Sequence, residues 1–187
     1  MTNRRDRGNE TQRMYETFNE SARTAVVAAQ EHARELRSLR ITPAHVLVGA
    51  LAQPDQELTV TVLSAHGITR DGLLAELASL PQISEAEWEA DEPVSARQRQ
   101  VRAERVRDAK PLPPGEKPPV PFSRNAKRIL ELALYEAMRY SELDIGAQYL
   151  VLGILQVDDP ATVAVLGGAD VVEAAEAELR AALEAAA

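Results

Sequence analysis

The sequence contains no cysteine, and aromatic residues make up only 4% of its 187 positions. The lack of thiols excludes disulfides, cysteine nucleophiles and cysteine-ligated zinc, and it suits a reducing compartment. The first thirteen residues are polar and unlike a signal peptide, and no apolar run is long enough to cross a bilayer. We therefore expect a soluble cytoplasmic protein with no membrane partner.

Positive charge is also in short supply, because 21 Lys and Arg residues stand against 29 Asp and Glu residues, a formal net charge of -8. This balance argues against nonspecific attraction to nucleic acid and favours a basic partner. The chain has no G-x-x-x-x-G-K-[ST] motif and no Gly-Lys pair, so it lacks the loop that cradles nucleotide phosphates. We expect neither an ATPase motor nor a bound cofactor.

Motifs for catalysis and for metal binding are missing as well. His32, His45 and His66 do not have the spacing of a metal site. Asp158 and Asp159 stand in an arrangement that is typical of a helix start, where carboxylates favour the dipole, rather than of an acid–base pair. No serine lies in a G-x-S-x-G elbow. The sequence therefore predicts a protein without enzymatic activity.

The chain does contain an internal repeat with an offset of 104 residues. The stretch "TFNESARTAVVAAQEHA" has a counterpart in "PFSRNAKRILELALYEA", and the offset brings Asn19 opposite Ser123. Both stretches place apolar residues at helical spacing, and Asn19 and Ser123 stand where an N-cap accepts free amide hydrogens. With few aromatics and abundant Ala and Leu, the composition favours closely packed helices over strands.

The repeat continues in "LRITPAHVLVGAL" and "LDIGAQYLVLGIL", which predict a central helix that is apolar on nearly every face. Thr42 with Pro43 forms the expected start of the first of these helices, and Gly146 takes the corresponding position in the second. Gly49 and Gly153 lie inside the helices, where glycine is best explained by the close approach of a neighbouring helix. Two further helices follow in each copy. The sequence thus predicts an all-α fold of two four-helix units.

The region between the copies breaks the symmetry. We divide the chain into a polar extension (1–13), a first copy (14–80), a linker (81–121) and a second copy (122–187). The linker begins with an acidic segment that contains a capping-box spacing, continues with a basic one, and ends in a proline-rich one that must be extended.

The basic segment suggests a nucleic-acid-associated regulator as an alternative function. The residues that would contact nucleic acid are Arg97, Arg99, Arg102, Arg105 and Arg107. The segment has no aromatic residue for base stacking and follows an acidic run that can neutralise it, so we favour a solvated or self-paired linker.

The repeated pattern, a Phe followed by a capped Ala-rich helix and an apolar helix with Gly, resembles the Clp N-terminal domain (Clp repeat) of Clp unfoldases. The stretches "MYETF" and "PFSRNAKR" are most similar to the starts of the two copies in actinobacterial ClpC. The resemblance implies two four-helix repeats related by pseudo-twofold symmetry that bind proteins for an unfoldase, as an adaptor, a competitor or a sequestering decoy. The chain is either a fragment or a free-standing relative, and its Met1 and Ala-rich end at Ala187 favour the second.

The resemblance also implies a phosphoarginine site in each repeat, built on a Gly-Thr-Glu-His motif. This sequence has "TPAH" and "GAQY" there, so Ala44 and Gln148 replace the glutamates, while His45 is retained. Asn19 and Ser123 stand where the family often has a Thr near the phosphate, although their role as caps needs no ligand. We expect weak or undetectable phosphoarginine binding.

A second surface of the family binds cyclic-peptide antibiotics in actinobacterial ClpC. The matching positions are Phe122, Lys127 and Glu131 in the second repeat, with Tyr15 and Val26 from the first. The alternative interpretation is that Lys127 and Glu131 form an ordinary surface ion pair beside a Phe that acts as a hydrophobic staple.

Overall fold

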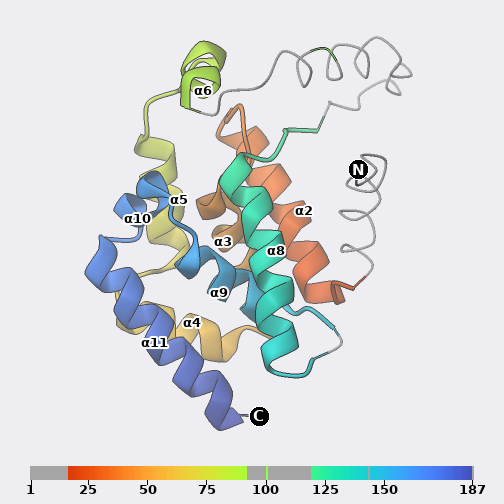
Figure 1. The fold of residues 1–187 in the computed structure, drawn as a ribbon. Helices are drawn as coiled ribbons and strands as arrows, with labels where there is room; N and C mark the ends of the chain where they lie inside the picture. Colours follow the sequence, from red (N-terminus) through yellow and green to blue (C-terminus); the bar gives the residue numbers. More distant parts are fainter. Residues whose placement is uncertain (1–16, 92–99, 101–118, 143, 187) are drawn as a thin grey trace.

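The computed structural model describes residues 17–91, 100, 119–142 and 144–186, and in this part of the chain the regular structure is helical (Figure 1). The first copy forms α2 (Glu20–Glu35), α3 (Pro43–Leu51), α4 (Glu57–Ala65) and α5 (Arg70–Ser79). The second forms α8 (Arg124–Arg139), α9 (Ala147–Gln156), α10 (Pro160–Val165) and α11 (Ala169–Ala186), and α6 (Glu85–Asp91) lies between the copies. The prediction of an all-α fold is confirmed.

The first helix of each copy begins at the predicted cap. The side chain of Asn19 accepts a hydrogen bond from the amide of Ala22 at 2.9 Å, and the hydroxyl of Ser123 accepts one from the amide of Ala126 at 3.1 Å. Each satisfies an amide that the helix itself leaves without a partner. The role of both residues as caps is therefore confirmed.

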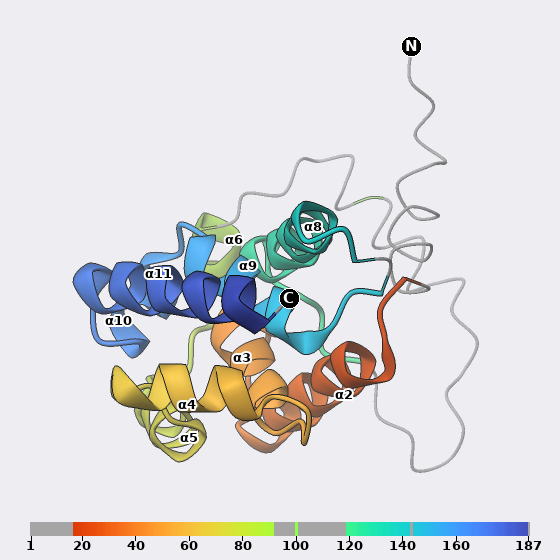
Figure 2. The same ribbon diagram turned by 90° about the horizontal axis from the view of Figure 1, so that it is seen from below.

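The central helices α3 and α9 form the core of the molecule. Every residue of α3 is buried, and α9 buries all of its residues except Gln148 and Gln156. Figure 2 shows the two helices between the remaining helices of the first copy on one side and those of the second copy on the other. A Cβ at Gly49 would lie 2.1 Å from the carbonyl oxygen of Ala25, so the predicted close approach is confirmed there.

The two copies are joined in an equivalent way at each end of the core. Isolated β-bridges connect Phe18 to Ile145 and Ile41 to Phe122, so the segment ahead of each central helix pairs with the start of the other copy. Each bridge has two backbone hydrogen bonds of 2.8 to 3.0 Å. Because the two bridges are related by the same sequence offset, they support the pseudo-twofold relation of the repeats.

Side-chain contacts follow the same symmetry. The hydroxyl of Ser21 donates to Asp55 at 2.8 Å, and the amide of Asn125 donates to Asp159 at 2.9 Å. Both bonds link the first helix of a copy to the start of its third helix, and both pairs again differ by the repeat offset. Positions related by this offset can therefore be compared as structural equivalents.

The acidic start of the linker folds back onto the first copy. The capping box predicted there is formed, since the amide of Ser84 donates to Glu87 at 2.7 Å and the amide of Glu87 donates to the Ser84 hydroxyl at 3.3 Å. The guanidinium of Arg40, itself buried, bonds both carboxylate oxygens of Glu85. These contacts tether the start of α6 to the first copy, while most of its described side chains remain exposed.

The nucleic-acid alternative concerns residues outside the described part of the chain. Arg97, Arg99, Arg102, Arg105 and Arg107 all lie there, so the basic segment stays a sequence-based hypothesis. Among the helices that the structure describes, none is long and apolar enough to span a lipid bilayer.

Candidate functional site

The surface predicted on the second repeat centres on α8. Phe122 precedes the Ser123 cap and packs partly buried against the core, while Lys127 and Glu131 are exposed. The ion pair suggested for Lys127 and Glu131 is wrong, because Glu131 accepts a hydrogen bond from Arg128 at 2.5 Å instead. Spacings of three and four residues both place side chains side by side on a helix, so Arg128 competes for the same carboxylate.

Two exposed apolar side chains extend this surface, and sequence analysis missed them. Tyr135 is 70% exposed and Met138 is 66% exposed. At 3.6 residues per turn they fall within about 80° of Lys127 and Glu131 around the helix, so the four share one side. We call Lys127, Glu131, Tyr135 and Met138 the α8 face. The regular helical spacing of these four residues in the sequence could have indicated this shared face.

The two positions predicted from the first repeat contribute less to this surface. Val26 is only 7% exposed and belongs to the hydrophobic core, so it presents little surface to a ligand. Tyr15 lies outside the described residues.

His45 is a structural residue in this fold. Its Nδ1 accepts from the amide of Thr42 at 3.2 Å, and its Nε2 lies 3.1 Å from the hydroxyl of Ser38. Burial lowers the pKa of His45 to about 4, with a smaller contribution from His32, so the imidazole is neutral at neutral pH. It completes the cap of α3 and carries no charge for a ligand.

The two glutamate positions of the family motif differ from each other in the structure. Ala44 is buried and offers no polar group. Gln148 is half-buried, and its side-chain oxygen accepts a hydrogen bond from Gln56 at 3.4 Å. In neither copy does this position carry a carboxylate.

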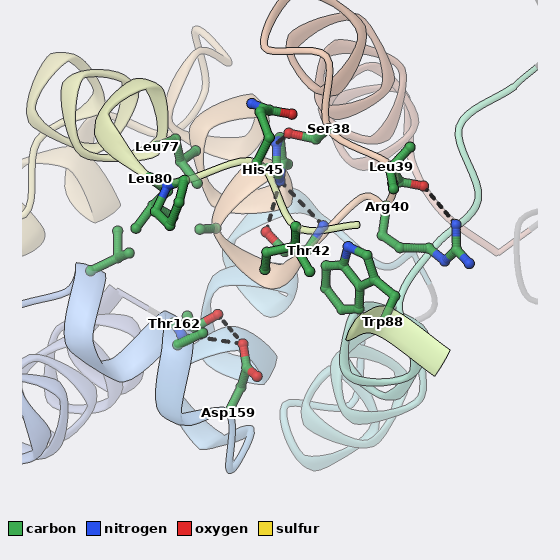
Figure 3. A pocket seen from close by; sticks show the side chains of 16 residues that line it. Ser38, Leu39, Arg40, Thr42, His45, Leu77, Leu80, Trp88, Asp159 and Thr162 are labelled. Atoms are coloured by element: carbon green, nitrogen blue, oxygen red, sulfur yellow. Dashed lines mark hydrogen bonds between the residues drawn. The ribbon is translucent and has the colours of Figure 1, made fainter. Parts of the chain in front are cut away.

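A cavity of about 100 Å³ lies beside Ala44 (Figure 3). Its walls come from the start of α3, the end of α5, the segment leading to α6, and α10 of the second copy. Trp88 of α6 closes one side, and Asp159 with Thr162 closes another. Sequence analysis did not find this cavity, because its walls come from segments that lie far apart along the chain.

Within the described residues, no group of three or more His, Asp or Glu side chains is placed to hold a metal ion. The polar groups around the cavity are instead bonded to one another. The Asp159 carboxylate accepts from Asn125 and from both the amide and the hydroxyl of Thr162. The cavity is thus suited to a ligand that binds through its shape and through apolar contacts.

The fold, with its paired central helices and repeated caps, can be compared with known families. The family model of the Clp repeat (R) N-terminal domain matches residues 17–169. The chain belongs to this family. The match includes both central helices and both bridges, and it extends from the segment ahead of α2 to the start of α11.

Several Clp repeat relatives are similar in sequence. An uncharacterized protein of Mycobacterium tuberculosis is 30% identical over 148 residues, which cover 78% of this chain and 45% of that protein. The chloroplastic chaperone protein ClpC2 of Oryza sativa is 27% identical over 146 residues, 78% of this chain and 13% of that protein. The chain therefore spans less than half the length of these relatives.

Solved N-domains of Clp proteins share the fold. The N-terminal domain of the chaperone ClpD from Arabidopsis thaliana superposes with a TM-score of 0.54 at 20% identity, covering 88% of this chain and 96% of that one. The N-terminal domain of Hsp104 from Candida albicans gives a TM-score of 0.53 at 16% identity, with 88% and 92% covered. These similarities concern the fold alone.

Proposed function

We propose that this chain is a non-catalytic protein-binding module that acts in regulated proteolysis, as an adaptor, a competitor or a sequestering decoy for a Clp unfoldase. The family and the fold support a binding role, and the sequence lacks the phosphate-binding loop that an unfoldase motor needs. The three roles use the same surface. They differ in whether the bound protein is delivered to the unfoldase or withheld from it.

The α8 face is the observation that carries this proposal. Tyr135 and Met138 are large apolar side chains that remain more than half exposed, although the fold buries comparable residues elsewhere. Aromatic residues and Met are enriched in protein interfaces, and exposed apolar patches mark interaction sites. Glu131 lies one turn from Tyr135 and Lys127 one turn further along the same side of α8, so both charges can help to orient a partner. Cyclic peptides of the ClpC-targeting kind are a second ligand class for this face.

The proposal is tested by a pull-down from a lysate of the source cell, scored for Clp subunits by mass spectrometry. The unmodified chain is expected to retain Clp subunits. The double variant Tyr135→Ala, Met138→Ala is expected to retain at least about tenfold less, because truncating the anchors of an interface commonly costs roughly 2 kcal/mol or more. Phe122 is a poorer probe since its ring also packs on the core.

The matched control is the double variant Leu58→Ala, Val60→Ala, which removes two exposed apolar side chains from α4. This control should retain Clp subunits like the unmodified chain. If both double variants lose Clp subunits equally, or if the unmodified chain retains none, the α8 face is not the recruiting surface.

Phosphoarginine is expected to bind weakly or not at all to either repeat. Its guanidinium needs a carboxylate, whereas Ala44 offers no acceptor and the oxygen of Gln148 is engaged by Gln56. A hydrogen bond to a charged group contributes roughly 1.5 to 3 kcal/mol, so its loss should cost about tenfold or more in affinity. The second repeat should be less impaired, because Gln148 can exchange its partner.

Calorimetric titration with free phosphoarginine tests this expectation. The double variant Ala44→Glu, Gln148→Glu should gain affinity, and free arginine serves as the control ligand. Equal affinity of the unmodified chain and the variant would show that other residues recognise phosphoarginine.

A further inference from the structure

The hydrogen bond between Gln56 and Gln148 has no equivalent on the other side of the pseudo-twofold relation. The repeat offset brings Ala44 opposite Gln148 and Pro160 opposite Gln56. In one place the two glutamine side chains meet, with the amide of Gln56 donating to Gln148. In the other, the side chains of Ala44 and Pro160 cannot form such a hydrogen bond, and the cavity of about 100 Å³ lies beside Ala44. The cavity therefore lies where the first copy has alanine at the position of Gln148 in the second copy.

The wall of this cavity is largely apolar. Leu77, Leu80, Ile83, Trp88 and Val165 line it together with Ala44. Leu80 and Ile83 are themselves exposed, so apolar surface continues from the cavity to solvent. Such a site gains most from a ligand that is itself apolar.

Most of the polar side chains of the lining are already paired inside the protein. Thr42 and Ser38 are bonded to His45, as described above, and Thr162 is bonded to Asp159. The guanidinium of Arg40 donates to the carbonyl of Leu39 (Figure 3) and to the carboxylate of Glu85. A polar ligand would have to break these bonds to replace them, whereas an apolar group leaves them intact.

Size and charge restrict the ligand further. An apolar cavity of about 150 Å³ accommodates a benzene ring, so this slightly smaller and open site suits one large side chain. Among the described side chains of the lining and of α6, Arg40 is outnumbered by Glu85, Glu87 and Asp159. The chain as a whole carries a net charge of -8. Basic residues next to the inserted group would therefore be attracted.

We propose that the cavity beside Ala44 binds one aromatic or branched aliphatic side chain of a protein segment that has basic residues on either side of it. This inference rests on the proposed role in protein binding and assigns that role a second contact, which shares no residue with the α8 face. Trp88 forms part of the wall, so the segment α6 takes a direct part in recognition rather than acting only as a linker.

Trp88 is the only tryptophan of the chain, so its fluorescence reports on the cavity that it lines. The test is a fluorescence titration of the full chain with the acetylated and amidated pentapeptide Lys-Lys-Phe-Lys-Lys. Its controls are the same peptide with Ala in place of Phe and the peptide Glu-Glu-Phe-Glu-Glu. We expect a saturable change with the first peptide, at an affinity at least about tenfold above that of either control.

Two variants on one helix locate the binding. Ala161 lines the cavity and is exposed, so Ala161→Phe should fill the cavity without a cost to the core and abolish the response. Ala164 is also exposed on α10 but is not part of the lining, so Ala164→Phe should leave the response unchanged. Both variants keep Trp88.

Three outcomes would overturn the inference: equal binding of the Ala peptide, equal binding of the Glu-flanked peptide, or unchanged binding by Ala161→Phe. Saturation of the Trp88 signal by free toluene, with no response to the Phe peptide, would assign the cavity to small molecules and would also reject a protein segment. None of these results affects the retention of Clp subunits by the α8 face, so the failure of this inference and that of the proposed function are distinguishable.

Discussion

Replacement of Gly49 by alanine is expected to lower the free energy of unfolding by about 3 kcal/mol or more, the upper part of the range for overpacked cores. In an ordinary helix the same change stabilises by roughly 1 kcal/mol, because glycine is a poor helix former. Here the new Cβ would lie 2.1 Å from the backbone oxygen of Ala25 and 3.2 Å from the backbone nitrogen of Ala29. Backbone atoms cannot rotate away, so α2 and α3 would have to separate.

Gly153 provides the matched control for this change. A Cβ there would lie 2.9 Å from the carbonyl oxygen of Ile129 and 3.2 Å from the Cβ of Leu132, a milder conflict that a shift of a few tenths of an ångström relieves. Gly153→Ala should therefore be less destabilising than Gly49→Ala. Urea unfolding followed by circular dichroism measures both. An unchanged midpoint for Gly49→Ala would show that the helices do not pack as closely as described.

The helices and their starts could be predicted because the signals are local. Asn19 and Ser123 are followed at once by amides that need an acceptor, and each precedes apolar residues at helical spacing. Gly49 could be placed at a helix contact because glycine destabilises a helix interior unless a neighbouring helix needs the space of a side chain. The repeat strengthened both predictions, since each signal occurs twice at one offset.

The candidate sites could be predicted only in part, because they depend on contacts between distant segments. Arg40 and Glu85 are 45 positions apart, and nothing local shows that this pair brings Trp88 back to the first copy. The capping box of Ser84 and Glu87 could be predicted from the sequence, but the contact of α6 with the first copy could not. Both Lys127 and Arg128 are spaced to reach Glu131, so spacing alone could not predict which of them binds it. The conformations of the side chains decide for Arg128.

A buried ion pair distinguishes the second copy. Glu136 of α8 is only 2% exposed, and both of its carboxylate oxygens accept hydrogen bonds from Arg180 of α11, at 2.6 and 3.0 Å. Gln156 of α9 donates to the same carboxylate at 3.0 Å. The network joins three helices of the second copy, and the equivalent position in the first copy is His32, which is paired only with Glu35 among the described ion pairs.

Arg180→Met is expected to lower the free energy of unfolding at neutral pH by about 3 to 5 kcal/mol. The methionine keeps much of the packing volume but leaves the carboxylate of Glu136 buried without its main partner. Arg139 lies 3.6 Å from Glu136 but is largely exposed, so it compensates little. Arg139→Met is thus the matched control and should change stability by less than about 1 kcal/mol. Similar losses for both variants would contradict a dominant role of Arg180.

Acidification should reduce the difference in the free energy of unfolding between the Arg180→Met variant and the unmodified chain. In the unmodified chain burial raises the pKa of Glu136, but the hydrogen bonds of Arg180 and Gln156 and the charges of Arg180 and Arg139 outweigh it and leave the pKa lowered. The ion pair therefore contributes stability above the ordinary carboxyl pKa, and this contribution is lost as pH falls through the lowered value.

In the variant the burial remains while the guanidinium is gone, so the pKa of Glu136 should rise above its ordinary value. The penalty for the buried charge is then greatest at neutral pH and disappears as the carboxyl takes up a proton. The double variant Glu136→Leu, Arg180→Met removes both charges and should recover most of the lost stability, since well-packed apolar residues often replace a buried ion pair without cost. Urea unfolding of the four proteins at neutral and acidic pH completes the test, because a loss caused by packing alone would be independent of pH and would persist in the double variant.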